Sequence, residues 1–203
     1  MGQKKTRIGV YGTGGIGGFI AGRLGSVCGR DDEASPALYL VARGDHRGAI
    51  EANGLTVISP DGTRNAVIPA AVSDTPEDFP PLDYCFLCVK GYDLVPAVRA
   101  LAGRMTAGGG IVPLLNGADI FQRIREAVGP EPVVYPGLIY ISSSIEAPGV
   151  VRHSGGKGQI VFGRDPDHSD LFPGSLIPIL EASRISNRWE EDPFPAIWEK
   201  YLF

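Results

Sequence analysis

The chain has 203 residues, of which 43% are hydrophobic and 21% are charged, as is typical of one globular domain with at most the beginning of a second. The formal net charge of -4 provides no basic face for a nucleic acid. Neither a signal peptide nor an apolar run of about 18 residues is visible, so we expect a cytoplasmic protein without a membrane span.

The first half of the chain alternates strand-like and helix-like patterns. RIGVYG (residues 7–12) predicts a strand, residues 15–27 a helix, LYLVAR (38–43) a second strand and residues 45–52 a second helix. This alternation predicts an α/β fold in which helices cover both faces of a mostly parallel, doubly wound sheet.

A glycine-rich turn joins the first predicted strand to the first helix. Its sequence, Gly12-Thr13-Gly14-Gly15-Ile16-Gly17, matches G-x-G-x-x-G. In this pattern Gly12 permits a tight turn, Gly14 lets a pyrophosphate approach the backbone, and Gly17 allows the helix to pack closely on the strand. The alternative is a glycine-rich turn without a ligand, but the position between strand and helix favours a dinucleotide site.

The second predicted strand ends at Arg43, where NAD-specific sites usually carry an acidic residue. Asp31, Asp32 and Glu33 precede this strand and therefore belong to its wrong end. A guanidinium can bind the extra phosphate of NADP bidentately, so the sequence favours NADP(H) over NAD. The alternative is an ordinary solvated arginine.

The middle of the chain predicts a hairpin over residues 55–72, with a turn at Asp61-Gly62, and then further βα units. Strands are expected at 83–89, 109–117 and 132–141, and helices at 94–105 and 119–128. Cys85 and Cys88 form a C-x-x-C within the first of these strands. We expect core packing there rather than redox or metal chemistry, because no second Cys/His pair lies nearby in the sequence.

From residue 142 onwards, short extended pieces at 144–153 and 158–165 predict an antiparallel extension of the sheet. A helix is expected at 174–183, a connector at 189–195 and a final helix that begins near the end of the chain. The last residues, PAIWEKYLF, resemble the first turns of an amphipathic helix without a C-terminal cap.

Three polar stretches follow predicted elements where a cofactor and a substrate would meet: Cys88-Val89-Lys90, Leu115-Asn116-Gly117 and Trp198-Glu199-Lys200. Together with the glycine turn, the VARG ending of the second strand and the segment GVVRHSGGKGQIVFG, their order resembles the amino-terminal part of the ketopantoate reductase (2-dehydropantoate 2-reductase) family. The resemblance implies a Rossmann-like NADPH-binding domain followed by a helical substrate domain. It also implies reduction of the ketone of 2-dehydropantoate to pantoate.

The resemblance implies a role for each matching residue. Lys200 would be the proton donor to the carbonyl oxygen, and Lys90 and Asn116 would lie where cofactor and substrate meet. Ser142 would line the cofactor through its backbone. An ammonium group is suited to this role because hydride transfer to a ketone builds negative charge on oxygen.

Each of these residues also has a structural interpretation. Lys200 could be solvated, Lys90 could end a strand, and Asn116-Gly117 is a common turn dipeptide. We expect His153 to have a structural hydrogen-bonding role and His46 and His168 to lie at the surface. No metal site is predicted.

The resemblance also implies a domain boundary. We expect residues 1–188 to form the NADP-binding domain, and residues 189–203 to be a connector and the first turns of a helical substrate domain that is otherwise missing. The predicted partner is a small 2-oxo acid, and the sequence leaves open whether the chain forms a homo-oligomer. Two alternatives remain, a family reductase acting on a different 2-oxo acid and a non-catalytic NADP(H)-binding module.

Overall fold

The computed structural model describes residues 5–29 and 35–202, with the side chain of Leu202 left undescribed. Asp31, Asp32 and Glu33 lie outside the described residues. The parallel sheet predicted from the sequence is present as a six-stranded sheet, which we call sheet A, with the strand order β5-β2-β1-β6-β7-β8. All five of its strand pairs are parallel.

Sheet A has the strand order of a Rossmann fold, in which the order reverses beside the first strand. Its strands are β1 (Arg7–Tyr11), β2 (Ala37–Val41), β5 (Ala71–Ser73), β6 (Leu82–Leu87), β7 (Met105–Pro113) and β8 (Val133–Val134). The reversal lies between β2 and β6, at the carboxyl end of β1, where the glycine turn begins. This is where open α/β sheets bind ligands.

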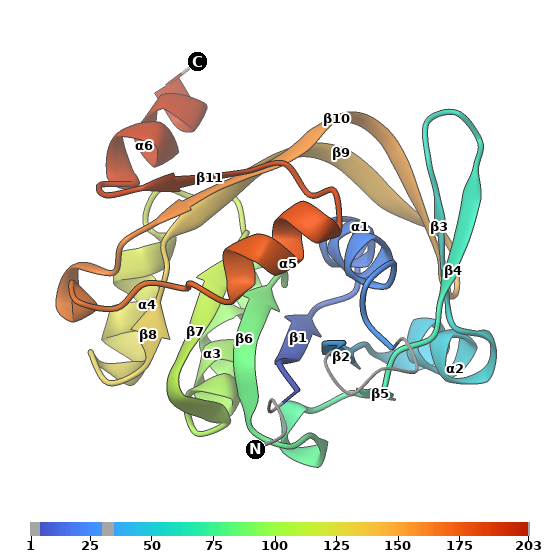
Figure 1. Cartoon of the computed structure of the whole chain (residues 1–203), viewed down its shortest axis with the longest axis horizontal. Coiled ribbons are helices and arrows are strands. Elements are labelled where there is room, and N and C mark those ends of the chain that lie inside the picture. Colours follow the sequence, from blue (N-terminus) through green and yellow to red (C-terminus); the bar gives the residue numbers. More distant parts are fainter. Residues whose placement is uncertain (1–4, 30–34, 203) are drawn as a thin grey trace.

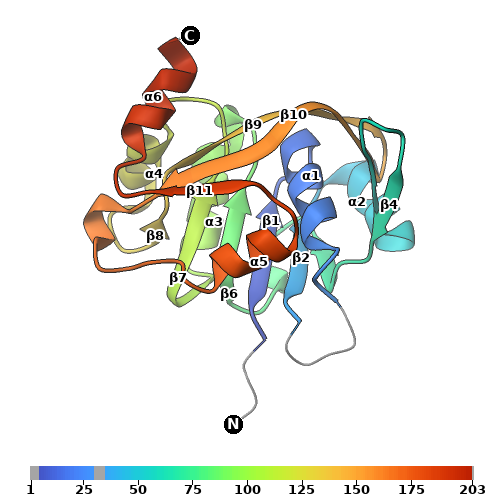
Figure 2. The same ribbon diagram turned by 45° about the horizontal axis from the view of Figure 1, so that its top comes forward.

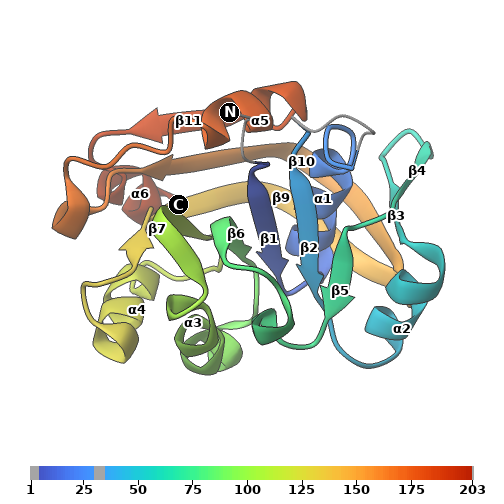
Figure 3. The ribbon, with the colours of Figure 1, turned by 60° about the horizontal axis from the view of Figure 1, so that its bottom comes forward.

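Helices cover both faces of sheet A, as Figures 1 and 3 show. On one face lie α3 (Leu94–Ala102) and α4 (Ile120–Val128), and on the other lie α1 (Gly15–Leu24) and α5 (Leu176–Ala182). The helix α2 (Gly44–Asn53) packs at the β5 edge. Each face buries its own apolar core, which explains the nearly continuous apolar runs of β1 and β6.

The antiparallel extension forms a second sheet, which we call sheet B, instead of continuing sheet A at its edge. Its order is β11-β10-β3-β4, and β9 pairs antiparallel with β10. The strands are β3 (Leu55–Ile58), β4 (Arg64–Val67), β9 (Gly137–Ala147), β10 (Val150–Gly163) and β11 (Asn187–Glu190). Figure 2 shows β9 and β10 passing over α1, so this helix lies between the two sheets.

Glycines on α1 allow sheet B to approach this helix closely. A Cβ at Gly18 would lie 3.0 Å from Val151 Cβ of β10, and a Cβ at Gly22 would lie 3.0 Å from Val57 Cβ of β3. Both distances are tighter than ordinary van der Waals contact. The glycines of GIGGFIAGRLG therefore serve packing against sheet B as well as the turn.

Several predicted elements have different bounds in the structure. The strand expected at 132–141 is divided at Pro136, because a proline cannot continue the ladder; β8 joins sheet A and β9 joins sheet B. The predicted helix at 94–105 ends at Ala102, before Gly103, and Met105 already begins β7. Residues 71 and 72, which were expected in the hairpin, belong instead to β5, which pairs with β2.

The expected connector is partly a strand. Trp189 and Glu190 belong to β11, and the Trp189 ring contacts the rings of Tyr135, Phe162 and Phe172 at centroid distances of 5.8, 5.4 and 5.0 Å. The final helix α6 (Phe194–Leu202) follows. The proposed domain boundary after residue 188 stays a prediction.

The three cysteines are free thiols, and the core packing predicted for the C-x-x-C is confirmed for Cys85 in β6, whereas Cys88 follows the end of the strand and is only partly buried. Cys85 is buried, and burial raises the pKa of its thiol to about 12. Cys88 is half-buried, and burial raises its pKa as well. The raised pKa values favour the protonated thiol over the reactive thiolate for both residues near neutral pH.

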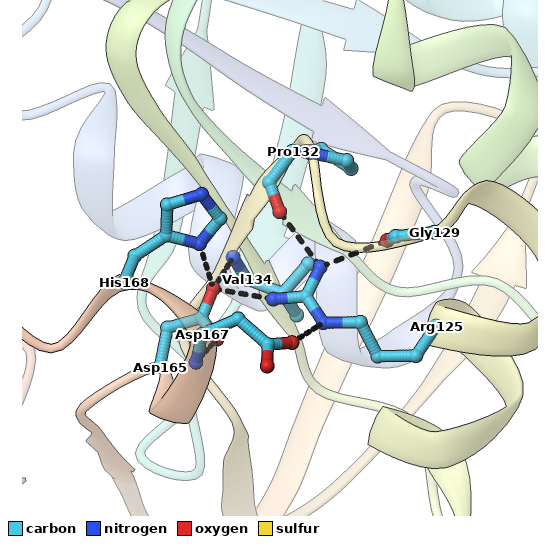
Figure 4. A network of polar contacts seen from close by, with 7 residues as sticks. All are labelled: Arg125, Gly129, Pro132, Val134, Asp165, Asp167 and His168. Atoms are coloured by element: carbon cyan, nitrogen blue, oxygen red, sulfur yellow. Dashed lines mark hydrogen bonds and ion pairs between the residues drawn. The ribbon is translucent and has the colours of Figure 1, made fainter.

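A buried ionic network joins α4, β8 and the segment after β10 (Figure 4). The carboxylate of Asp165 accepts hydrogen bonds from Arg125 Nη2 at 2.5 Å, from the Val134 N–H at 2.8 Å and from His168 Nδ1 at 2.9 Å. Burial raises the pKa of Asp165, but these hydrogen bonds outweigh it and hold the pKa below its ordinary value. His168 is therefore half-buried in a structural network, which corrects the prediction of a simple surface position.

Candidate active site

The glycine turn has the geometry that its spacing predicts. Gly12 has a φ of +91°, and a Cβ there would lie 3.0 Å from the backbone of Cys88 and Val89. A Cβ at Gly17 would lie 3.0 Å from Val10 Cγ1 on β1. Gly14 is the N-cap of α1, where no side chain caps the helix and nothing lies within 4 Å of a built Cβ. The open backbone at Gly14 leaves room for a ligand group at the helix start.

The turn is anchored to the end of β2. The N–H groups of Gly12 and Thr13 both donate to the Val41 carbonyl, at 3.1 and 3.3 Å. Only 2% of Thr13 is exposed, so its side chain faces the protein interior and its backbone carries the turn. The position of the turn is thus set by the adjacent strand as well as by α1.

A cleft of about 240 Å³ opens beside the turn. Its walls come from the turn, the end of β2, the start of α2 and the loop after β6, and they are formed by Tyr11, Gly12, Thr13, Gly14, Val41, Ala42, Arg43, His46, Cys88, Val89, Lys90, Asp93 and Ile145. The cleft therefore brings together the predicted residues Gly12, Thr13, Gly14, Arg43 and Lys90.

The charges at this cleft suit a phosphorylated ligand. The side chain of Arg43 is 55% exposed and lies 3.5 Å from Asp93, and Lys90 is exposed at the end of the strand. An exposed guanidinium can exchange a carboxylate partner for a phosphate, which it binds in the same fork geometry. The uncapped helix start, the two cations and the apolar wall from Val41 and Val89 all fit a dinucleotide.

His46 is a cleft residue that the sequence interpretation placed at the surface. It lies in the first turn of α2 and is half-buried. Its Nε2 lies 2.8 Å from the Thr13 carbonyl oxygen, and the Gly149 N–H donates to its Nδ1 at 3.0 Å. The only sequence signal was its place three residues after Arg43, because the two partners are distant in the chain.

The strand β9 covers the glycine turn. A Cβ at Gly15 would lie 2.5 Å from the carbonyl carbon of Ser143, so the two backbones are in close contact. Ser142 itself is exposed and pairs with Gly155 across β9 and β10. Within the described part of the chain, the Ser143 hydroxyl has no hydrogen-bond partner. The residue nearest the turn is thus one position after the predicted Ser142.

A second polar group joins α6 to the end of β7. The Lys200 ammonium donates to Asn116 Oδ1 at 3.0 Å and to the Ile139 carbonyl at 3.0 Å. Burial lowers the pKa of Lys200 from its ordinary value. A half-buried ammonium with a lowered pKa gives up its proton more readily than a solvated lysine does.

Tyr201 fixes this pair and was not predicted from the sequence. Its hydroxyl accepts a hydrogen bond from the Gly117 N–H at 2.7 Å and lies 3.5 Å from Asn116 Oδ1. The turn dipeptide Asn116-Gly117 is therefore held by α6 at two points. No local pattern identifies such a residue, since its partners lie 84 and 85 positions away.

The predicted site residues thus form two groups rather than one. Asn116 and Lys200 contact each other but do not line the cleft beside the glycine turn, and Ser142 lines neither group. Gly15, Ile16 and Gly17 begin α1 next to the cleft. Because Lys90 follows β6 and Asn116 follows β7, two adjacent parallel strands bring both groups to the same edge of sheet A.

His153 has the structural role predicted for it, with Nε2 lying 3.0 Å from the carbonyl oxygens of both Gly155 and Gly156.

Among the residues that the structure describes, no helix is both long and apolar enough to cross a membrane.

Comparison with known proteins identifies the family. The family model described as "Ketopantoate reductase PanE/ApbA" matches residues 8–167. The chain belongs to the ketopantoate reductase family. The matched region begins within β1, contains the glycine turn and extends beyond β10, so it includes the cleft and Asn116 but not Lys200.

The chain is similar to a 2-dehydropantoate 2-reductase of Halobacterium salinarum, with 31% identity over 197 residues. It is also 30% identical over 171 residues to a 2-dehydropantoate 2-reductase of Mesorhizobium japonicum. The crystal structure of 2-dehydropantoate 2-reductase from Porphyromonas gingivalis W83 matches with a TM-score of 0.86 and 30% identity, and covers 98% of this chain and 68% of that one.

The alignment with the Halobacterium protein covers 97% of this chain but only 61% of that relative. For the Mesorhizobium protein the alignment covers 74% of this chain and 50% of the relative. These relatives are oxidoreductases by name, and the Rossmann-type fold of the family is that of nicotinamide-dependent reductases.

Proposed function

We propose that this chain is the cofactor-binding part of an NADPH-dependent reductase that converts 2-dehydropantoate to pantoate. The observation that carries the proposal is that two features lie at the same edge of sheet A. One is an open glycine turn with Arg43 and Lys90 at its cleft, and the other is a half-buried lysine paired with Asn116. Membership of the ketopantoate reductase family supports the named substrate.

The cleft residues would bind and orient the cofactor. The backbone of residues 12–17 would meet the pyrophosphate at the start of α1, and Arg43 would bind the 2′-phosphate that distinguishes NADP from NAD. The family resemblance implies that Ser142 lines this site through its backbone, and the contact between Ser143 and Gly15 supports β9 as the covering strand. When bound, the nicotinamide supplies the hydride.

Lys200 would act on the substrate oxygen. As hydride reaches the carbonyl carbon, negative charge develops on the oxygen, and an ammonium group at hydrogen-bond distance stabilises it and then gives up a proton. Asn116 holds the ammonium in place through its Oδ1, and Lys90 would help to position the carboxylate of the 2-oxo acid. The lowered pKa of Lys200 suits a proton donor.

The test is NADPH oxidation with 2-dehydropantoate, measured for the 203-residue chain and for the full product of its gene. Substituting Lys200→Met in the full product should reduce kcat at least about a hundredfold and leave the Kd for NADPH within about twofold. Lys157→Met, which removes an exposed lysine on β10, is the matched control and should change neither value.

Two results would each contradict a different part of the proposal. If Lys200→Met keeps full turnover, the proton-donor role is wrong. If the full product binds NADPH but reduces other 2-oxo acids and not 2-dehydropantoate, the cofactor assignment stands and the substrate assignment fails.

Three further points stay predictions: the cytoplasmic location, the homo-oligomer, and residues 189–203 as the start of a substrate domain.

A further inference from the structure

The imidazole of His46 connects two segments that are far apart in the sequence. One is the glycine turn, through the Thr13 carbonyl at 2.8 Å, and the other is the turn between β9 and β10, through the Gly149 N–H at 3.0 Å. These partners are 33 and 103 positions from His46. The ring also lines the cleft that we assign to the dinucleotide.

The two partners define the protonation state of the ring. A backbone N–H can only donate, so Nδ1 must carry the lone pair that accepts from Gly149; a carbonyl oxygen can only accept, so Nε2 must carry the hydrogen. The geometry therefore requires the neutral Nε2–H tautomer. An imidazolium would place a second N–H against the N–H of Gly149 and lose that hydrogen bond.

Both connected segments pack closely against neighbouring elements, so loss of the Gly149 hydrogen bond would change how these segments sit against each other. The Gly149 turn lies against α2, because a Cβ at Gly149, whose φ is +73°, would be 3.0 Å from Ala49 Cβ. Further along β9, Ser143 contacts Gly15 at the other end of the glycine turn. His46 therefore fastens the covering strands to the loop beneath them.

We propose that His46 is a positioning residue for the dinucleotide, because its neutral ring holds the glycine turn against the β9–β10 turn and protonation of the ring releases this connection. The proposal rests on the dinucleotide site proposed above. Burial lowers the pKa of His46, and the hydrogen bond to Thr13 opposes only part of this shift, so the ring is neutral at physiological pH.

The charged groups around His46 are mixed. Arg43, Lys90 and Asp93 share its cleft, and Arg43 is paired with Asp93. On the strands that flank the β9–β10 turn, Glu146 and Arg152 pair with each other. On α2 itself, Asp45 precedes the ring and Arg47 is paired with Asp74 at 3.2 Å. Burial is the main cause that lowers the pKa of His46, and the hydrogen bond to Thr13 opposes it.

The experiment measures the Kd of the 203-residue chain for NADP⁺ from about pH 8 to about pH 5, the range in which histidine titrates. His46→Ala removes both hydrogen bonds and should raise the Kd about tenfold at the upper pH. His46→Asn keeps an acceptor near the place of Nδ1 but cannot be protonated. Glu51→Gln, an exposed change on the same helix, is the control and should bind as the unmodified chain does.

The unmodified chain should lose at least about fivefold more affinity on acidification than His46→Asn does. The 2′-phosphate of the ligand also titrates, but it contributes equally to both proteins and cancels in the comparison. Equal pH dependence in the two proteins would overturn the proposal. A relative gain of affinity for the unmodified chain at low pH would overturn it too, because the imidazolium would then be contacting phosphate.

A second measurement needs neither a cofactor nor a variant. Nitrogen chemical shifts of the His46 ring should report the Nε2–H tautomer. The protection factor of the Gly149 amide, which is its exchange rate corrected for the intrinsic pH dependence of exchange, should fall as the pH drops below the pKa of His46. A hydrogen on Nδ1 in the neutral form would contradict the proposed connection even if the variants fail to fold. If this measurement agrees but NADP⁺ does not bind at any pH, the proposed function fails separately.

Discussion

Lys200 on the final helix donates a hydrogen bond to Asn116 at the end of β7, with 3.0 Å between Nζ and Oδ1, although 84 positions separate the two residues. The next residue, Tyr201, accepts the Gly117 N–H at 2.7 Å. The helix is thereby set in register on the strand end, and a lysine that sequence alone could leave in solvent is half-buried there.

Tyr201 should matter for catalysis through the residues it holds. Tyr201→Phe leaves the Gly117 N–H without its partner and loosens Asn116, so kcat of the full gene product should fall about fivefold. The Kd for NADPH should stay unchanged, because the hydroxyl does not line the cleft. Steady-state kinetics check this, with the exposed Tyr92→Phe as control; equal kinetics for both variants would contradict the positioning role.

The pH profile of turnover should reflect Lys200. Because burial lowers its pKa, Lys200 loses the ammonium proton at a lower pH than an ordinary lysine, whose pKa is about 10.4. We therefore expect kcat to decline on the alkaline side while the enzyme is still folded. A kcat that stays constant up to the pH of unfolding would argue against Lys200 as the donor.

Arg43 should decide between the two nicotinamide cofactors. Arg43→Ala removes a charged hydrogen-bond donor to the 2′-phosphate, which should raise the Kd for NADPH about 10- to 100-fold. The Kd for NADH should change less than about twofold. Binding titrations of both cofactors check this, and Arg64→Ala on the exposed part of β4 is the matched control. An equal loss for the two cofactors would contradict the phosphate contact.

The Asp165 network should make stability depend on acid pH. Its pKa is lowered in the folded state, so the stabilisation is fully present above the ordinary aspartate value of about 4 and is lost as the pH falls through the lowered folded value. Asp165→Asn should lower the free energy of unfolding by about 3 kcal/mol at neutral pH, because it removes the buried carboxylate partner of Arg125 and leaves only the half-exposed Asp167.

Urea titrations of Asp165→Asn and the unmodified chain between about pH 7 and about pH 2 should therefore converge at the acid end. Asp167→Asn is the control. Asp167 also pairs with Arg125, at 2.7 Å from Nε, but its side chain is 43% exposed, so the substitution should cost less than about 1 kcal/mol. A constant difference at every pH would mean that the Asp165 carboxylate does not titrate in this way.

Two glycine substitutions should have opposite effects on thermal stability. Gly22→Ala places a Cβ 3.0 Å from Val57 Cβ, so α1 must move away from β3, at a cost of about 1–3 kcal/mol. Gly48→Ala on α2 meets nothing within 4 Å and should gain up to about 1 kcal/mol of helix propensity. Melting temperatures that shift the same way would contradict the packing between α1 and sheet B.

Local patterns were sufficient to predict the Rossmann core and the glycine turn. Strand and helix periodicity repeats within each βα unit. The roles of Gly12 and Gly17 depend on close contacts with residues on β1 or beside it. The hairpin and the antiparallel extension were predicted, but not that they form a separate sheet B, because its strands come from residues 55–67 and 137–190 and their pairing is long-range. Pro136, which separates β8 from β9, was the local sign of the division.

The site divides in the same way. Arg43, Lys90 and Asn116 follow strands, so their place at the ligand edge of sheet A could be predicted from topology. His46 and Tyr201 could not, since each acts through backbone groups of distant segments that carry no sequence signature. The β9–β10 register, which is irregular at Val150/Val151, His153/Gly155 and Gly155/Gln159, could not be predicted from the sequence, and nor could the choice between Ser142 and Ser143.

The central claim is that the cleft beside the glycine turn binds NADP(H). Isothermal titration calorimetry of the 203-residue chain with NADPH and with NADH tests this claim most directly. We predict saturable binding of one NADPH per chain, with NADH at least about tenfold weaker and this preference abolished in Arg43→Ala. Absence of NADPH binding by the folded chain, or equal affinity for both cofactors, would contradict the account.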